Sequence, residues 1–214
     1  MYQRLGELVK RLLVVSLVSV LLLTSCSSAP ATPEQTKGPV EPSYSKSDLL
    51  QFESAFASLR VDRDDIERNT RYFKVNYDNG FAPTIYQIDG LQPVLGIYLV
   101  YYGDSWIFWD QYIIAIDNER VAQSVSYADV ARETTSSGVV ESFAITDGTI
   151  GVDYSASDAT LELLEKIASA SSVTIRLKGE SRNYDIELGD DDIELAKTMA
   201  NSFKWLKWQY ESSN

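Results

Sequence analysis

The sequence predicts an α+β domain in which helices pack on an antiparallel sheet. Two observations predict it: apolar residues at helical spacing near both ends of the domain, and apolar runs joined by tight turns in its middle. The chain has 214 residues, of which 44% are hydrophobic and 23% charged, the balance of an ordinary folded protein. We expect one domain over residues 45–214, preceded by a leader (1–25) and a tether (26–44).

Three helices are predicted from capping residues followed by apolar side chains at helical spacing. Ser45 and Asp48 are spaced as in a capping box, Ser157 is a typical N-cap, and three aspartates, residues 190–192, precede the last helix. The repeating apolar positions are Leu49, Phe52, Phe56 and Leu59 in the first helix, Leu161, Leu164 and Ile167 in the second, and Ile193, Ala196, Ala200, Phe203, Leu206 and Tyr210 in the third.

Strands are predicted between residues 72 and 125, where turn pairs such as Asp89-Gly90 separate the apolar runs. Short strands joined by tight turns indicate antiparallel pairing. The runs Val94–Tyr102 and Ser105–Ile116 predict a long hairpin that is apolar on both faces. Its second strand is expected to place Trp106, Phe108 and Tyr112 on one face and Ile107, Trp109 and Ile113 on the other. Since such strands are covered on both sides, we place this hairpin in the middle of the sheet.

The remaining segments carry weaker signals. Residues 73–77 and 139–145 are expected to be strands, and residues 173–188 a second hairpin, because apolar and polar side chains alternate. Residues 127–138 are polar and are expected to form a loop. The charged segment 62–68 is expected to be a solvated turn or a helix extension. It is not a calcium loop, because Ile66 stands where a ligand oxygen is required.

Composition excludes several chemistries. Histidine is absent and cysteine occurs once, which excludes Ser-His-Asp and Cys-His catalysis in their usual forms, Cys/His zinc sites and intramolecular disulfides. The net charge is −12, and an acidic surface repels phosphate backbones. We therefore expect no nucleic-acid partner and no cofactor.

Residues 1–26 have the layout of an export leader. The basic residues Arg4, Lys10 and Arg11 precede an apolar run from Leu12 to Leu23. A membrane-spanning helix needs about 20 apolar residues, whereas the apolar region of a signal peptide needs about 7–15. The run is therefore predicted to belong to a cleavable signal peptide.

The leader ends in Leu23-Thr24-Ser25-Cys26. This motif resembles the lipobox of bacterial lipoprotein precursors, which is leucine, two small residues and cysteine. The resemblance covers residues 1–26 alone. It implies cleavage between Ser25 and Cys26 and a diacylglycerol on the Cys26 thiol, and two or more acyl chains make a stable membrane anchor. The alternatives are a secretory leader with an incidental cysteine and an uncleaved helix.

Residues 27–43 contain four prolines among small and polar residues, a composition typical of a disordered tether. Its span is about 23 Å as a coil and about 58 Å fully extended. We expect an extracytoplasmic, lipid-anchored location. In the lipoprotein class, a residue other than aspartate after the cysteine, here Ser27, permits sorting to an outer membrane where the source has two membranes.

Four tryptophans are candidate contacts for sugar rings or an apolar peptide: Trp106, Trp109, Trp205 and Trp208. The alternative for each is core packing. Among the carboxylates, residues 190–192 are expected to cap a helix rather than hold a cation. Asp110 is expected to form an ion pair or lie at an edge rather than act in catalysis.

The expected function is that of a membrane-anchored binding or assembly module of the cell envelope, without enzymatic activity and with an envelope protein or glycan as partner. One alternative is an envelope glycan hydrolase, which needs paired carboxylates about 5–10 Å apart. A second is a small solute-binding lipoprotein, for which roughly 170 residues is short.

Overall fold

The computed structural model describes residues 44–74, 80–146 and 159–213. These ranges belong to one compact unit, residues 41–214. The leader, the cleavage site at Ser25 and Cys26, the tether 27–43 and the expected N-cap Ser157 lie outside the described residues. None of the helices within these ranges is long and apolar enough to cross a membrane.

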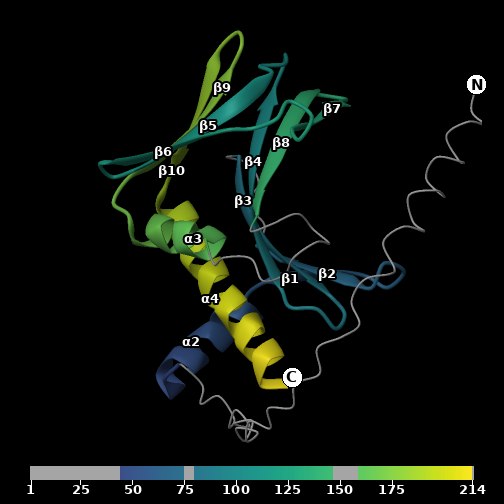
Figure 1. Cartoon of the computed structure of the whole chain (residues 1–214), viewed down its shortest axis with the longest axis vertical. Coiled ribbons are helices and arrows are strands. Elements are labelled where there is room, and N and C mark those ends of the chain that lie inside the picture. The colour runs from purple at the N-terminus through teal and green to yellow at the C-terminus, as the bar shows by residue number, and fades with distance from the viewer. Residues whose placement is uncertain (1–43, 75–79, 147–158, 214) are drawn as a thin grey trace, which may run out of the picture. The chain divides into compact units, whose positions relative to one another are not determined.

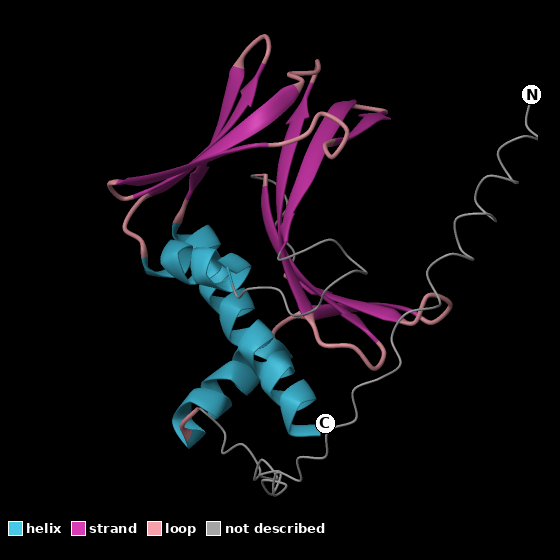
Figure 2. Ribbon diagram, viewed as in Figure 1, coloured by secondary structure: helices cyan, strands magenta, loops and turns pink. Residues whose placement is uncertain are grey.

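The fold is α+β, as predicted, and its strands form two antiparallel sheets (Figures 1 and 2). The six-stranded sheet contains, in order, β1 (Arg60–Asp64), β2 (Asn69–Phe73), β3 (Phe81–Ile88), β4 (Val94–Gly103), β8 (Gly138–Thr146) and β7 (Ala131–Thr135). The four-stranded sheet contains β10 (Asn183–Leu188), β9 (Val173–Gly179), β5 (Trp109–Ile116) and β6 (Glu119–Ser124). The helices are α2 (Lys46–Ala57), α3 (Ala159–Ser169) and α4 (Asp190–Ser213).

The helices begin as their capping residues predict. The Asp48 amide donates to Ser45 Oγ (3.2 Å) and the Ser45 amide donates to the Asp48 carboxylate (3.1 Å), which completes the capping box of α2. At the start of α4 the Asp192 carboxylate accepts the Gly189 amide (3.0 Å). The capping interpretation of residues 190–192 is therefore confirmed for Asp192.

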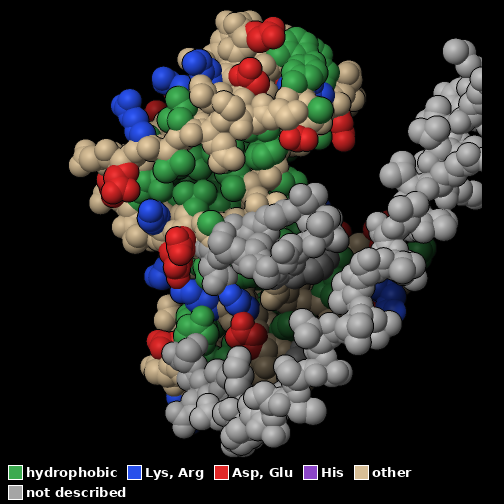
Figure 3. Space-filling model, viewed as in Figure 1, with side chains coloured by type: hydrophobic (Ala, Val, Ile, Leu, Met, Phe, Trp, Pro, Cys, Tyr) green, Lys and Arg blue, Asp and Glu red, His purple; other side chains and the backbone are tan. Residues whose placement is uncertain are grey.

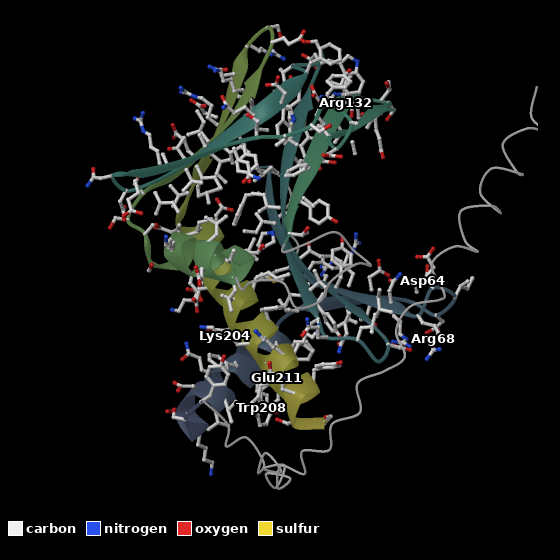
Figure 4. All side chains as sticks on the ribbon, viewed as in Figure 1. Asp64, Arg68, Arg132, Lys204, Trp208 and Glu211 are labelled. Carbon is white, nitrogen blue, oxygen red and sulfur yellow. The ribbon has the colours of Figure 1, made fainter. Side chains whose placement is uncertain are left out.

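α4 joins the other helices to the sheets. It packs against α2, α3 and β3, and its buried side chains include Leu195, Met199 and Phe203. Lys204 forms an ion pair with Glu165 of α3 and lies 5.4 Å from the ring centroid of Phe52 in α2 (Figure 4). One α4 residue thus contacts both shorter helices.

The prediction that residues 94–116 form a hairpin is wrong, because β4 and β5 lie in different sheets. β4 pairs with β3 and β8, whereas β5 pairs with β6 and β9. Residues 104–108 carry the chain between the sheets, and Phe108 has a φ of 53°, in the left-handed region that a strand does not use. Both strands are nevertheless interior strands of their own sheets, as their apolar character predicted.

The expected alternation of faces along β5 also differs. The register of β5 against β9 shifts between Trp109 and Gln111, and such a β-bulge inserts one extra residue into a strand. Trp109 and Tyr112, expected on opposite faces, are consequently both buried. Asp110, at the bulge, is exposed.

A buried carboxylate fixes the crossover. The Glu141 side chain, on β8, is 0% exposed. Its Oε1 accepts the backbone amides of Ile107 (2.6 Å) and Phe108 (3.0 Å), and its Oε2 accepts from Arg132 Nε (3.2 Å). Since amides bound to a carboxylate cannot also donate to a strand ladder, the chain leaves the six-stranded sheet here.

Arg132, on β7, makes further contacts at this crossover between the sheets (Figure 4). Its guanidinium donates to the carbonyls of Tyr127 (2.7 Å), Val130 (3.2 Å) and Trp109 (3.3 Å). It also lies 3.8 Å from the ring centroid of Tyr127, within cation–π distance. One ion pair therefore joins β7, β8, the start of β5 and the segment before β7.

Three further expectations are corrected. In the segment 62–68, residues 65–68 form a turn, which is one of the two expected alternatives, but residues 62–64 belong to β1. Residues 127–138 contain β7. Both β1 and β7 are edge strands made mostly of exposed polar residues, so no apolar alternation marks them. The strand expected at residues 73–77 ends at Phe73 as β2, and residues 75–79 lie outside the described ranges.

We predict that Glu141→Ala lowers the free energy of unfolding by about 3–5 kcal/mol, because it leaves the largely buried Arg132 without its counter-charge and two backbone amides without their acceptor. Urea denaturation of the variant measures this. The control is Asp185→Ala, which removes a solvent-exposed carboxylate–arginine pair with Arg176 and should barely move the urea midpoint. Equal small losses in both variants would contradict the role given to Glu141.

Candidate functional site

A cleft of about 810 Å³ lies between the two sheets and α3. Side chains from β5, β6, β8 and α3 line it. In Figure 3 hydrophobic side chains gather in a hollow beside β6. Its volume falls within the range of about 300–1,000 Å³ typical of small-molecule sites.

One wall of the cleft is the face of a sheet. Alternate residues of β5 and of β6 line it, among them Tyr112, Ile114 and Val121, and alternate residues of a strand point to the same face. Tyr112 and Gln123 are cross-strand partners, and the Tyr112 hydroxyl donates to Gln123 Oε1 (3.0 Å). Burial raises the pKa of the Tyr112 phenol above its ordinary value.

The facing wall is the end of β8. Four consecutive residues, 143–146, line the cleft there, so the cleft meets the edge of this strand and not one of its faces. The Phe143 ring lies 6.1 Å from the ring centroid of Tyr112 and 6.2 Å from that of Trp109. Phe143 and Tyr112 therefore join the two walls at the floor of the cleft.

The rim of the cleft is charged. Glu119, Asp129, Glu162 and Lys166 line it and are exposed. An apolar floor below a few charged groups is the usual arrangement of a ligand pocket, in which the floor supplies affinity and the polar groups orient the ligand.

The candidate tryptophans lie elsewhere. Trp109 is 0% exposed and packs in the core, whereas Trp106 is half-buried and stacks on Phe108 at the crossover. Trp205 and Trp208 stack on each other in α4, with ring centroids 5.1 Å apart. Figure 4 shows Trp208 on α4, well away from Arg132 and the crossover. None of the four tryptophans lines the cleft, and the structure does not bring them together.

Sequence reasoning missed the residues that form the cleft. Tyr112 and Phe143 were expected only as strand residues, because nothing local indicates that they line a cleft between two sheets. Val121 carried one signal: it is the one large apolar side chain in β6, and it is 51% exposed.

Among the residues that the structure describes, three carboxyl groups outside the cleft lining have a shifted pKa. Hydrogen bonds lower the pKa of each below its ordinary value: from Ser45 to Asp48, from Arg63 to Asp89, and from Arg176 to Asp185. A catalytic general acid needs the opposite, a raised pKa. No group of three or more metal-ligating side chains occurs among residues 44–74, 80–146 and 159–213.

No family model, no curated protein and no solved structure matches this chain.

We predict that alkaline pH destabilises the domain partly through Tyr112. Because its pKa is raised on folding, the unfolded chain loses this proton first, and the free energy of unfolding falls as pH rises above about 10. Tyr112→Phe should flatten this decline, measured by urea denaturation between about pH 8 and about pH 11. Tyr102→Phe, at a half-exposed tyrosine outside the cleft, is the control. An unchanged pH dependence in Tyr112→Phe would contradict the prediction.

Proposed function

We propose that this chain is the precursor of a bacterial lipoprotein that works outside the cytoplasmic membrane. Its signal peptide is cleaved between Ser25 and Cys26, and the lipid on Cys26 holds the domain at a membrane surface. The support is the order of features in the leader: basic residues, a short apolar run, small residues and cysteine, followed by a proline-rich tether.

The domain, in this proposal, is a binding module that takes an elongated apolar ligand in the cleft. The observation that carries the proposal is the apolar floor formed by Tyr112 and Phe143 beneath a charged rim. Burying about 200 Å² of apolar ligand surface there would supply about 5 kcal/mol before the cost of association. A ligand would thus be retained without any covalent chemistry.

The hydrolase alternative has less support. The rim carboxylates Glu119, Asp129 and Glu162 are exposed, whereas a carboxyl that serves as a general acid is typically desolvated. Binding is therefore the function that the cleft favours.

We predict that Cys26→Ala prevents processing, because the thiol is the atom that accepts the diacylglycerol. The variant should accumulate as the uncleaved precursor and take up no labelled palmitate in cells. Gel mobility and label incorporation report both changes. Ser27→Ala is the matched control and should be processed normally; a Cys26→Ala chain of mature size at the membrane would contradict lipidation.

We predict that the cleft binds the apolar fluorophore N-phenyl-1-naphthylamine. A polypeptide of residues 27–214, which omits Cys26 and its lipid, retains the whole compact unit and avoids detergent, into which the probe would partition. Val121→Lys places an ammonium group on the cleft wall and should weaken binding about tenfold or more, which corresponds to about 1.4 kcal/mol.

The matched control is Val61→Lys. Val61 is also an exposed valine on an edge strand, 60% exposed against 51% for Val121, but it lies outside the cleft. Its variant should bind the probe as the unaltered chain does. Absence of binding, or equal affinity in the two variants, would overturn the proposed site.

A further inference from the structure

We infer that the ligand of the cleft is an extended peptide segment, which adds as a strand to the edge of β8 beyond Ser142. This inference rests on the proposed function, because it names the class of ligand for the same cleft.

The first observation is the register of β8. β4 pairs with β8 from Val139 to Thr146, whereas β7 pairs with it only from Gly138 to Ser142. Among the strands that the structure describes, none continues the β7 side of β8 past Ser142. Residues 143–145 of β8 line the cleft consecutively, so the cleft lies along this edge of the strand. A strand added there would continue the position of β7 along β8.

The second observation is the wall opposite that edge. A strand beside β8 would lie about 4.8 Å from it, with every second side chain directed at the same neighbouring surface. On the face of β5 and β6, the half-buried Ile116 and the exposed Val121 are presented in this way, beside the buried Tyr112 and Ile114. An extended peptide with apolar residues at alternate positions therefore fits both walls at once: its backbone faces β8 and its apolar side chains face β5 and β6.

The same geometry favours a peptide over an acyl chain. A strand edge presents backbone N–H and C=O groups that need hydrogen-bond partners. Hydrocarbon packed along residues 143–145 would bury such groups without partners, at a cost of about 1–3 kcal/mol each. A peptide backbone satisfies them.

The rim adds a preference of charge. Three carboxylates, Glu119, Asp129 and Glu162, surround the cleft with one cation, Lys166. An excess of negative charge at the mouth attracts basic residues that flank the apolar segment. The expected partner is thus a protein segment with alternating apolar residues bordered by lysine or arginine.

The test uses a short fluorescent peptide of alternating valine and threonine with a lysine at each end, titrated into residues 27–214 and followed by anisotropy. The comparison peptides carry N-methyl groups at alternate residues, one peptide for each edge of the strand. Because N-methylation removes amide donors and keeps the side chains, at least one of them should bind about tenfold more weakly or worse. Equal affinity for all three peptides would overturn strand addition.

Hydrogen exchange locates the contact. Peptide binding should slow amide exchange in residues 143–145 and leave α2 (Lys46–Ala57) unchanged, and Val121→Lys should abolish the effect. Protection confined to other segments would overturn the inference.

The two proposals fail in different ways. If the naphthylamine probe or a dodecyl-chain ligand binds and the peptide does not, the cleft is an acyl-chain site: the inference is overturned and the proposed function stands. If neither the apolar ligands nor the peptide binds, the proposed function is overturned as well.

Discussion

The hydrogen bonds that the Glu141 carboxylate accepts from the amides of Ile107 and Phe108 determine where the chain passes from the first sheet of this domain to the second. They bind the two amides at the point where a hairpin with β4 would have formed, and the chain turns away into a second sheet. The ion pair with Arg132 supplies a positive partner for a carboxylate that is fully buried. Buried ion pairs add little net stability compared with apolar packing. The role of this one is to specify where the chain turns.

The cleft follows from that turn. If β5 had paired with β4, its apolar residues would have been covered within one sheet. Because β5 instead pairs with β6 and β9, the buried Tyr112 and Ile114 and the half-buried Ile116 lie along one wall of the cleft, opposite the end of β8. The β-bulge at Trp109 completes the arrangement, since it directs Trp109 and Tyr112 to the buried side together. A small number of polar contacts at the crossover thereby positions apolar residues along the cleft.

The sequence was sufficient to predict an element wherever the interaction that stabilises it is local. The capping box joins Ser45 and Asp48, three residues apart, and the hairpin of β9 and β10 turns within a few residues, so local patterns predicted both. It was insufficient where the partner is distant. Glu141 binds amides 33 and 34 residues earlier in the chain, and no periodicity encodes that contact.

The polar edge strands β1 and β7 were missed because their pairing is decided by the backbone of their neighbours and not by their own side chains. The candidate site was missed for the same reason: the cleft is lined by common residue types from β5, β6, β8, α3 and the segment before β7, and by none of the four tryptophans. The lipid anchor, predicted from Cys26, is a separate proposal and involves no residue of the cleft.

The most direct test of this account is the strand pairing in solution, measured by nuclear Overhauser effects in the isotopically labelled mature chain. The account predicts cross-strand contacts between β5 and β9, such as Ile114 with Ile175, and between β4 and β8, such as Leu99 with Phe143. It predicts no backbone contacts that pair β4 with β5. A ladder of contacts joining residues 94–102 to residues 105–116 in one hairpin would contradict it, since the two sheets would then be continuous and the cleft between them absent.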